Sequence, residues 1–213
     1  INLYYSRNKY TLTLSKGTGI SAVTGAGTYY YGQSVTIDAT VSNGYTWSKW
    51  SDNNTTKKAT MTMPANALTL TANATLNTYT ISYTLNGGTV SPANPTSYNV
   101  TTSSFTLNNP IKTGYTFAGW TGTGLSSATK TVTVAKGSTG NRSYTANWTA
   151  NSATKYVVNH YQMNVSGSGY TLKETENKTG TTASSVTIAN LKKTYTGFTF
   201  EGGKGTTSAT ATK

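Results

Sequence analysis

The side chains that could carry catalysis are few in this chain. Its 213 residues include five acids, one histidine and no cysteine. The acids are Asp38, Asp52, Glu174, Glu176 and Glu201. Hydrolysis of a glycosidic bond needs two carboxylates facing each other across one site, and no spacing among these acids indicates such a pair. Asp38 alternates with Thr36 and Thr40, which predicts a solvated strand face.

The chain also has few residues that could bind a metal ion or act as a nucleophile. Glu174 and Glu176 flank Thr175 and share one strand face, but a calcium cage usually needs more carboxylates than two. His160 is the single histidine, which excludes a multi-histidine cluster within one chain and predicts a packed or surface imidazole. No Gly-x-Ser-x-Gly elbow with an acid and a base partner is present. We therefore predict no enzyme, no cofactor and no metal.

Aromatic residues offer a binding surface instead. Trp47, Trp50, Trp120 and Trp148 could stack on sugars, but Trp50 and Trp120 hold equivalent places in a repeat, so core packing is the simpler interpretation. The consecutive Tyr29, Tyr30 and Tyr31 must show at least one ring on each face of a strand. They are the candidate ligand-binding residues, with an interface between modules as the alternative.

The net charge of +12 comes from few acids more than from many bases. The basic residues are scattered, whereas nucleic-acid binders cluster them, so no specific nucleic acid is expected. Anionic polymers such as wall polyphosphates or sulfated glycans stay possible partners, and solubility is the plain alternative. No apolar run predicts a membrane span or a signal peptide. The chain begins with Ile1, which we interpret as a fragment or mature portion of a longer protein.

One aromatic motif organises the chain and occurs three times. The copies are Gly44–Trp50 (GYTWSKW), Gly114–Trp120 (GYTFAGW) and Gly197–Gly203 (GFTFEGG). Large aromatic residues on both faces suit a strand that is covered on both sides. We therefore expect each copy at the centre of a small β core, and three copies predict three modules.

Strands in the same order surround the first two copies, in a composition that favours β structure and shows no helical period. We predict modules at 9–77, 78–150 and 151–213. In the third, the expected strands are 156–161, 185–188 and 197–200, with another at 208–213, and the closing strand that matches 70–75 and 144–149 is missing.

The N-terminal residues 1–8 have no module of their own. Ile1–Tyr5 is an apolar strand directly before an opening strand, so it is interpreted as the closing strand of an upstream third module. The 213 residues would then be one period of a tandem array cut out of phase, and Ile1, Leu3 and Tyr5 would be strand-complementation residues. A module that lacks an edge strand should be completed by an added one, in cis or in trans. The alternative is a frayed terminal tail.

The motifs Leu85–Thr89 (LNGGT), Gly114–Trp120 and Tyr144–Trp148 (YTANW) make 79–149 resemble a Listeria–Bacteroides, or internalin-type B, repeat. Residues 10–77 resemble a divergent relative, and 155–213 are similar to mucin-binding-protein-like repeats. The resemblance implies an all-β or β-rich α+β fold, with three tandem small β-grasp-like modules in an elongated array. It brings no catalytic residues.

The resemblance also implies an extracellular place, on a bacterial cell surface or cell wall. We expect a structural stalk or filament segment whose partners are other copies of itself, in tandem or head-to-tail. The alternative is an adhesin that binds host or cell-wall glycans or anionic polymers.

Overall fold

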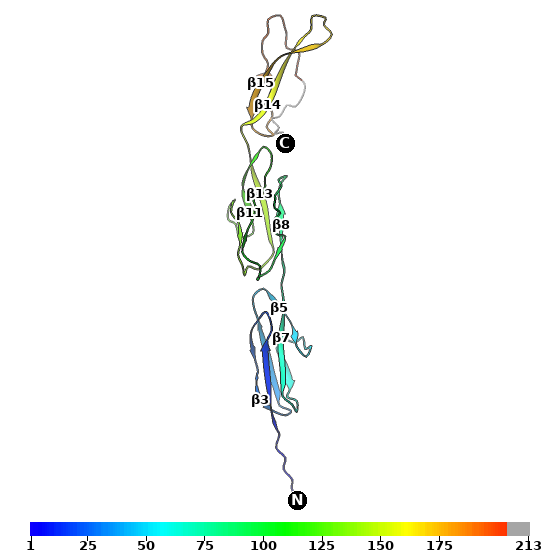
Figure 1. The fold of residues 1–213 in the computed structure, drawn as a ribbon, viewed down its shortest axis with the longest axis vertical. Helices are drawn as coiled ribbons and strands as arrows, with labels where there is room; N and C mark the ends of the chain where they lie inside the picture. Colours follow the sequence, from blue (N-terminus) through cyan, green and yellow to red (C-terminus); the bar gives the residue numbers. More distant parts are fainter. Residues whose placement is uncertain (204–213) are drawn as a thin grey trace. The chain divides into compact units, whose positions relative to one another are not determined.

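The computed structural model describes residues 1–203, and strands form nearly all of their regular structure (Figure 1). The all-β prediction is confirmed, because the helix content of the described residues is limited to a single turn of 3-10 helix, η1 (Ile188–Asn190). The strands are β1 (Lys9–Lys16), β2 (Ile20–Thr24), β3 (Gly27–Tyr30), β4 (Ser34–Val41), β5 (Tyr45–Trp50), β6 (Ala59–Thr62), β7 (Leu68–Leu76), β8 (Tyr79–Thr84), β9 (Ser97–Tyr98), β10 (Phe105–Thr106), β11 (Tyr115–Gly122), β12 (Thr133–Val134), β13 (Arg142–Ala150), β14 (Thr154–Met163) and β15 (Tyr170–Gly180).

The chain divides into two compact units, and the boundary runs through the middle repeat. The first unit comprises Ile1–Ile81, Pro95–Phe105 and Thr133–Arg142, and the second comprises Ser82–Asn94, Thr106–Val132 and the chain from Ser143 onward. Strand β8 continues from one unit into the other. The middle repeat therefore contributes strands to both units.

Two open sheets build the first unit from β1 to β7. One has the strand order β3-β1-β7-β5, and the other has the order β2-β4-β6. Strand β1 lies inside its sheet, antiparallel to β3 and parallel to β7. Alternating apolar residues of both sheets meet in one core, which includes Leu12, Val35, Ile37, Trp50, Met63 and Leu70.

The middle repeat has the same strand arrangement. Its main sheet has the order β11-β13-β8-β9, so the opening strand β8 lies between β9 and the closing strand β13. Strands β7 and β13 also share one pattern of buried and exposed positions along their nine residues. The second unit buries Leu107, Trp120, Val132, Tyr144 and Ala146.

The aromatic motif forms an edge strand, so its predicted central position is wrong. Strands β5 and β11 end their sheets and pair only with β7 and β13. A register shift in each strand, after Trp47 and after Phe117, changes which side chains face inward. The tryptophans that follow, Trp50 and Trp120, are 0% exposed. Their predicted core role is confirmed, and the bulge explains how an edge strand supplies the largest core side chain.

Among the described residues of the third repeat, the hairpin β14–β15 is the only sheet. The strands predicted at 185–188 and 197–200 do not form, apart from a single bridge position at Ser185. Strands β5 and β11 are held by a closing strand, and no such strand is present in the described part of this repeat, so its aromatic segment has no ladder to join. The strand predicted at 208–213 lies outside the described residues.

The bulge in β11 provides a test of this packing. Gly119 has a φ of +140°, and a Cβ there would lie 2.8 Å from the backbone nitrogen of Thr129. Gly119→Ala should therefore lower the free energy of unfolding by roughly 3 kcal/mol, because strain and a backbone clash add. Gly124→Ala is the control, since its φ is +75° and nothing lies within 4 Å; it should cost about 1 kcal/mol. Equal losses in urea titrations would contradict the clash.

Candidate functional site

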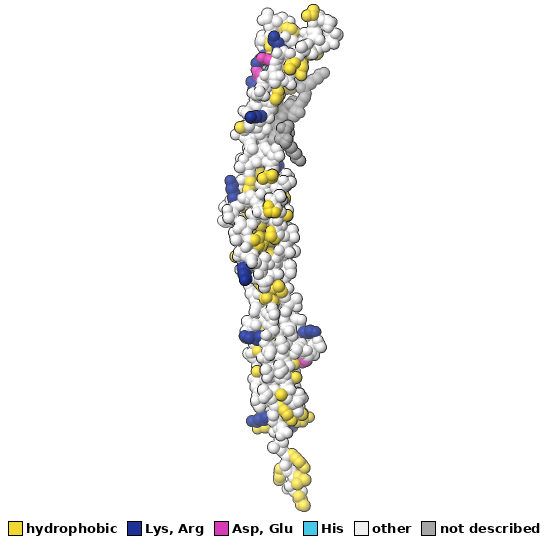
Figure 2. All heavy atoms as spheres, viewed as in Figure 1, with side chains coloured by type: hydrophobic (Ala, Val, Ile, Leu, Met, Phe, Trp, Pro, Cys, Tyr) yellow, Lys and Arg dark blue, Asp and Glu magenta, His cyan; other side chains and the backbone are white. Residues whose placement is uncertain are grey.

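The N-terminal residues 1–8 make no strand, unlike the predicted strand at Ile1–Tyr5. The side chains of Ile1, Leu3, Tyr4 and Tyr5 are all largely exposed, and Figure 2 shows hydrophobic side chains along this segment. Hydrogen bonds attach only the C-terminal end of this segment to the first repeat. Arg7 Nη1 donates to the Tyr31 carbonyl at 3.0 Å, and the Tyr31 amide donates to the Asn8 carbonyl at 2.9 Å. The segment thus presents unpaired backbone and apolar side chains.

Strand β14 has one unpartnered edge in the described residues. The opening strands β1 and β8 each have an antiparallel neighbour, β3 or β9, and a closing strand, β7 or β13, on the other side. Strand β14 has its antiparallel neighbour, β15, but nothing in the position of the closing strand. No strand within residues 1–203 pairs with the N–H and C=O groups on that edge, and an edge of this kind is a template for an added strand.

An open groove runs along β14 and is closed on one side by the segment 186–203. Its volume is about 1890 Å³. Large apolar side chains that remain exposed in this repeat are Val157, Tyr161, Met163, Val165, Tyr170, Leu172, Phe198 and Phe200. All buried hydrophobic side chains of the described chain lie in the first two repeats, so the described part of the third repeat has an incomplete core.

The three consecutive tyrosines do not form one patch. Tyr29 is half-buried, packs on the core of the first unit and donates its hydroxyl to the Gly25 carbonyl at 3.0 Å. Tyr30 and Tyr31 are 48% and 51% exposed. Lys9 Nζ lies 4.7 Å from the centre of the Tyr30 ring. Only Tyr30 and Tyr31, with Arg7 and Lys9 beside them, can therefore contact a ligand.

A polar cluster on the hairpin was missed by the sequence reasoning. His160 and Glu174 are partners across β14 and β15, and Glu176 lies two residues further on the same face. Their nearest ligand atoms all lie within 4.8 Å of one another. His160 Nε2 is buried and has no hydrogen-bond partner among residues 1–203. The alternate spacing of the two glutamates was visible in the sequence, but the pairing of the strands that adds His160 was not.

Lysines neutralise these carboxylates. Lys193 contacts both glutamates, and Lys178 lies 2.8 Å from Glu176. Hydrogen bonds from Tyr195 and Lys193 lower the pKa of Glu174, and those from Lys178 and Lys193 lower the pKa of Glu176 to about 2. The same contacts raise the pKa of Lys193. The cluster attaches the segment around residue 193 to β15.

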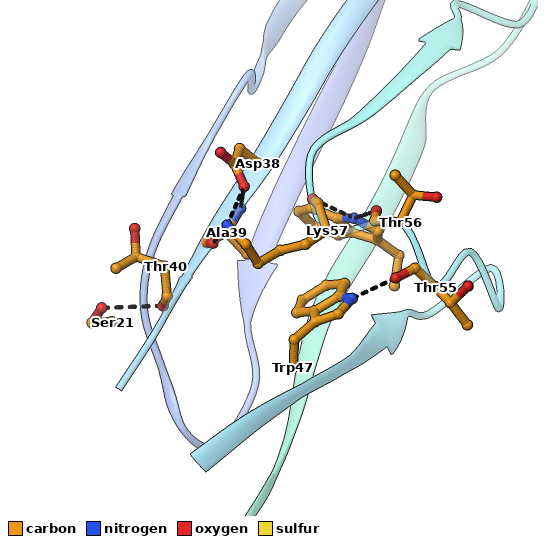
Figure 3. A network of polar contacts seen from close by, with 9 residues as sticks. Ser21, Asp38, Ala39, Thr40, Trp47, Thr55, Thr56 and Lys57 are labelled. Atoms are coloured by element: carbon orange, nitrogen blue, oxygen red, sulfur yellow. Dashed lines mark hydrogen bonds and ion pairs between the residues drawn. The ribbon is translucent and has the colours of Figure 1, made fainter. Parts of the chain in front are cut away.

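A second polar network fixes the loop between β5 and β6 (Figure 3). Lys57 Nζ donates to Asp38 Oδ1 and to the Ala39 carbonyl, both at 2.8 Å. The indole of Trp47 donates to the Thr55 carbonyl at 2.7 Å, so the loop backbone is satisfied by side chains of the sheet. The carboxylate is engaged in this structural role, so the network offers no free acid for catalysis.

Within the second unit, hydrogen bonds join the end of the middle repeat to the hairpin. The Thr182 amide donates to the Asn151 carbonyl at 2.8 Å, and its hydroxyl donates to the Gly114 carbonyl at 2.7 Å. Thr154 and Thr182 share a further hydroxyl hydrogen bond and are both buried. Polar groups buried with partners restrict orientation, so this junction limits motion of the hairpin relative to β11 and β13.

Two family models match the chain. Residues 10–78 match the divergent InlB B-repeat domain, and residues 79–160 match the Listeria-Bacteroides repeat domain. The chain belongs to this repeat family. Neither match extends beyond residue 160, so the likeness of the third repeat to mucin-binding-protein repeats remains a prediction. No curated protein and no solved structure matches the chain.

The family places the chain in a broad functional class. Listeria-Bacteroides repeats are typical of bacterial surface proteins, occur in extracellular surface proteins and are typically non-catalytic. In the described part of the chain, no helix has the length and apolarity of a membrane span. Residues 10–160 therefore consist of repeats of a kind typical of bacterial surface proteins.

The Lys57–Asp38 pair is expected to make the stability of the folded chain decrease as the pH falls into the acid range. The hydrogen bond from Lys57, followed by that from the Ala39 amide, lowers the pKa of Asp38 below its ordinary 3.8. A lowered folded-state pKa contributes stability above pH 3.8 that is lost as the pH falls through the folded value. The difference in Tm between wild type and Asp38→Asn should be constant near neutral pH and shrink below pH 3.8.

The neighbouring lysine supplies the control for that measurement. Lys57→Met should lose most of the pH-dependent stability that Asp38→Asn loses, because it removes the largest cause of the lowered pKa while the Ala39 amide still donates to Asp38. Lys58→Met should not, since Lys58 makes the smallest contribution to the shift. Identical pH profiles for wild type and Asp38→Asn would show that the pair adds nothing to stability.

Proposed function

We propose that this chain is a non-enzymatic structural segment of a bacterial surface protein, and that copies assemble by strand complementation at the third repeat. The observation that carries the proposal is the unpartnered edge of β14 beside an incomplete apolar core, together with an unpaired apolar segment at Ile1–Tyr5. A closing strand supplied by another copy would pair with β14 and extend the β ladder from one copy into the next.

The repeat itself sets the register of the added strand. Asn8-Lys9-Tyr10-Thr11-Leu12 aligns with Asn77-Thr78-Tyr79-Thr80-Ile81, so Ile1, Leu3 and Tyr5 align with Leu70, Ala72 and Ala74. Leu70 and Ala72 are buried, and Ala74 packs on the same core. The same alternation places Ile1, Leu3 and Tyr5 on the inward face of a docked strand, with Tyr4 on the other face.

The pairing partner on β14 follows in the same way. Strands β1 and β7 run parallel, with Leu14 opposite Leu70 and Lys16 opposite Ala72. Aligning Tyr10 with Tyr156 makes His160 the equivalent of Leu14 and Gln162 the equivalent of Lys16. We therefore place Ile1 opposite His160 and Leu3 opposite Gln162, in a parallel ladder between two molecules.

Light scattering across a range of concentrations tests the assembly. Wild type should form concentration-dependent chains, and Leu3→Asp should stay monomeric, because a carboxylate on the inward face would be buried without a partner. Tyr4→Asp is the matched control and should still assemble. Monomeric wild type at every concentration would overturn assembly between copies.

Cysteine pairing tests the register directly, because the chain has no cysteine of its own. A Leu3→Cys variant mixed with a Gln162→Cys variant should form a mixed disulfide, since neighbouring Cα atoms in a ladder lie within disulfide reach. Tyr4→Cys mixed with Gln162→Cys should react much less. Equal yields from the two mixtures would refute the parallel register.

A second candidate function is adhesion through Tyr30 and Tyr31. The exposed rings lie beside Lys9 and Arg7, and aromatic rings next to cationic side chains suit sulfated or phosphorylated glycans. Binding to heparin that persists at physiological salt and weakens about tenfold on Tyr30→Ala would favour it, whereas Tyr29→Phe should leave binding unchanged because Tyr29 faces the core. Elution at low salt, unaffected by Tyr30→Ala, would indicate only non-specific charge attraction.

A further inference from the structure

The cluster on the hairpin β14–β15 has the composition of a transition-metal site. It brings one imidazole and two carboxylates together from neighbouring strands, with ligand atoms within 4.8 Å of one another. Zinc sites commonly take three protein ligands of these types at about 2.0–2.2 Å and keep a fourth position for water. Tetrahedral geometry then requires donor separations of about 3.4 Å. A modest rotation of the two glutamate side chains would bring their oxygens to that distance from each other and from the imidazole nitrogen.

The unpartnered imidazole nitrogen is an independent sign of a missing ligand. His160 Nε2 is buried and makes no hydrogen bond within the described structure. A buried polar atom without a partner is costly and uncommon. The pairing of β14 and β15 also shifts register immediately after His160, and such bulges often redirect a side chain at a binding site.

The groups around the cluster fit the outer shell of a metal site. The Tyr195 hydroxyl donates a hydrogen bond to Glu174, and such a contact orients the carboxylate. The His160 and Tyr195 rings pack edge to face with centroids 6.1 Å apart. Lys193 supplies a positive charge between the two carboxylates, so it occupies the position that a cation would take.

We propose that His160, Glu174 and Glu176 bind a divalent transition-metal ion such as Zn²⁺, which displaces the Lys193 ammonium. The bound ion would join β14 to β15 and give the buried imidazole nitrogen a partner. Calcium is a poor fit, because it prefers six to eight oxygen ligands. Lys193 is a competitor in this proposal, so its removal should strengthen binding.

The experiment titrates untagged full chain with Zn²⁺ and follows the single histidine by NMR. Because His160 is the only imidazole in the chain, its ring resonances should shift on Zn²⁺ addition and stay unchanged with Ca²⁺. Calorimetry should show that His160→Ala abolishes binding, and that Lys193→Met strengthens it on the order of tenfold, because a charge-assisted contact no longer competes.

Lys192→Met is the matched control, since Lys192 lies next in sequence but contacts the Phe200 ring instead of the glutamates. It should leave the Zn²⁺ affinity unchanged. If the His160 resonances of both wild type and Lys193→Met do not respond to Zn²⁺, the site does not exist. Equal affinity in wild type and His160→Ala would place the ion elsewhere and refute the assignment.

Discussion

The hydrogen bonding of the opening strand is the constraint on which each repeat depends. An opening strand has two edges, and both must be paired for it to lie inside a sheet. In the first two repeats β3 or β9 pairs with one edge and β7 or β13 with the other. The closing strand then holds the aromatic edge strand, so its presence determines whether the aromatic residues enter a core.

The third repeat shows what happens in the described chain without that strand. Its hairpin forms, because β14 and β15 pair locally. The segment 197–200 has the same alternation as β5 and β11 yet forms no strand, and Phe198 and Phe200 remain exposed. Polar contacts among Glu174, Glu176 and Lys193 hold the covering segment in place of apolar packing. A local pattern is therefore insufficient without the non-local partner.

The same dependence separates the part of the candidate site that the sequence can indicate from the part that it cannot. Ile1, Leu3 and Tyr5 are chosen because the repeat order predicts a closing strand out of place, and their role stays a prediction. The His160 cluster could not, because it depends on the register of β14 against β15. The sequence predicted the exposure of the three tyrosines only in part. Strand alternation requires that neighbouring rings lie on opposite faces, but it does not tell that Tyr29 is the one that faces the core.

The sequence by itself determined the β class, the order of the main strands in the first two repeats and the membership of the repeat family, because alternation, turn residues and internal repetition are local and cumulative. Only the tertiary structure decided that the aromatic strand lies at a sheet edge and that a bulge turns Trp50 and Trp120 inward. It also decided which polar groups meet across β14 and β15. These features depend on pairing between distant segments, and register is set by packing across the whole sheet.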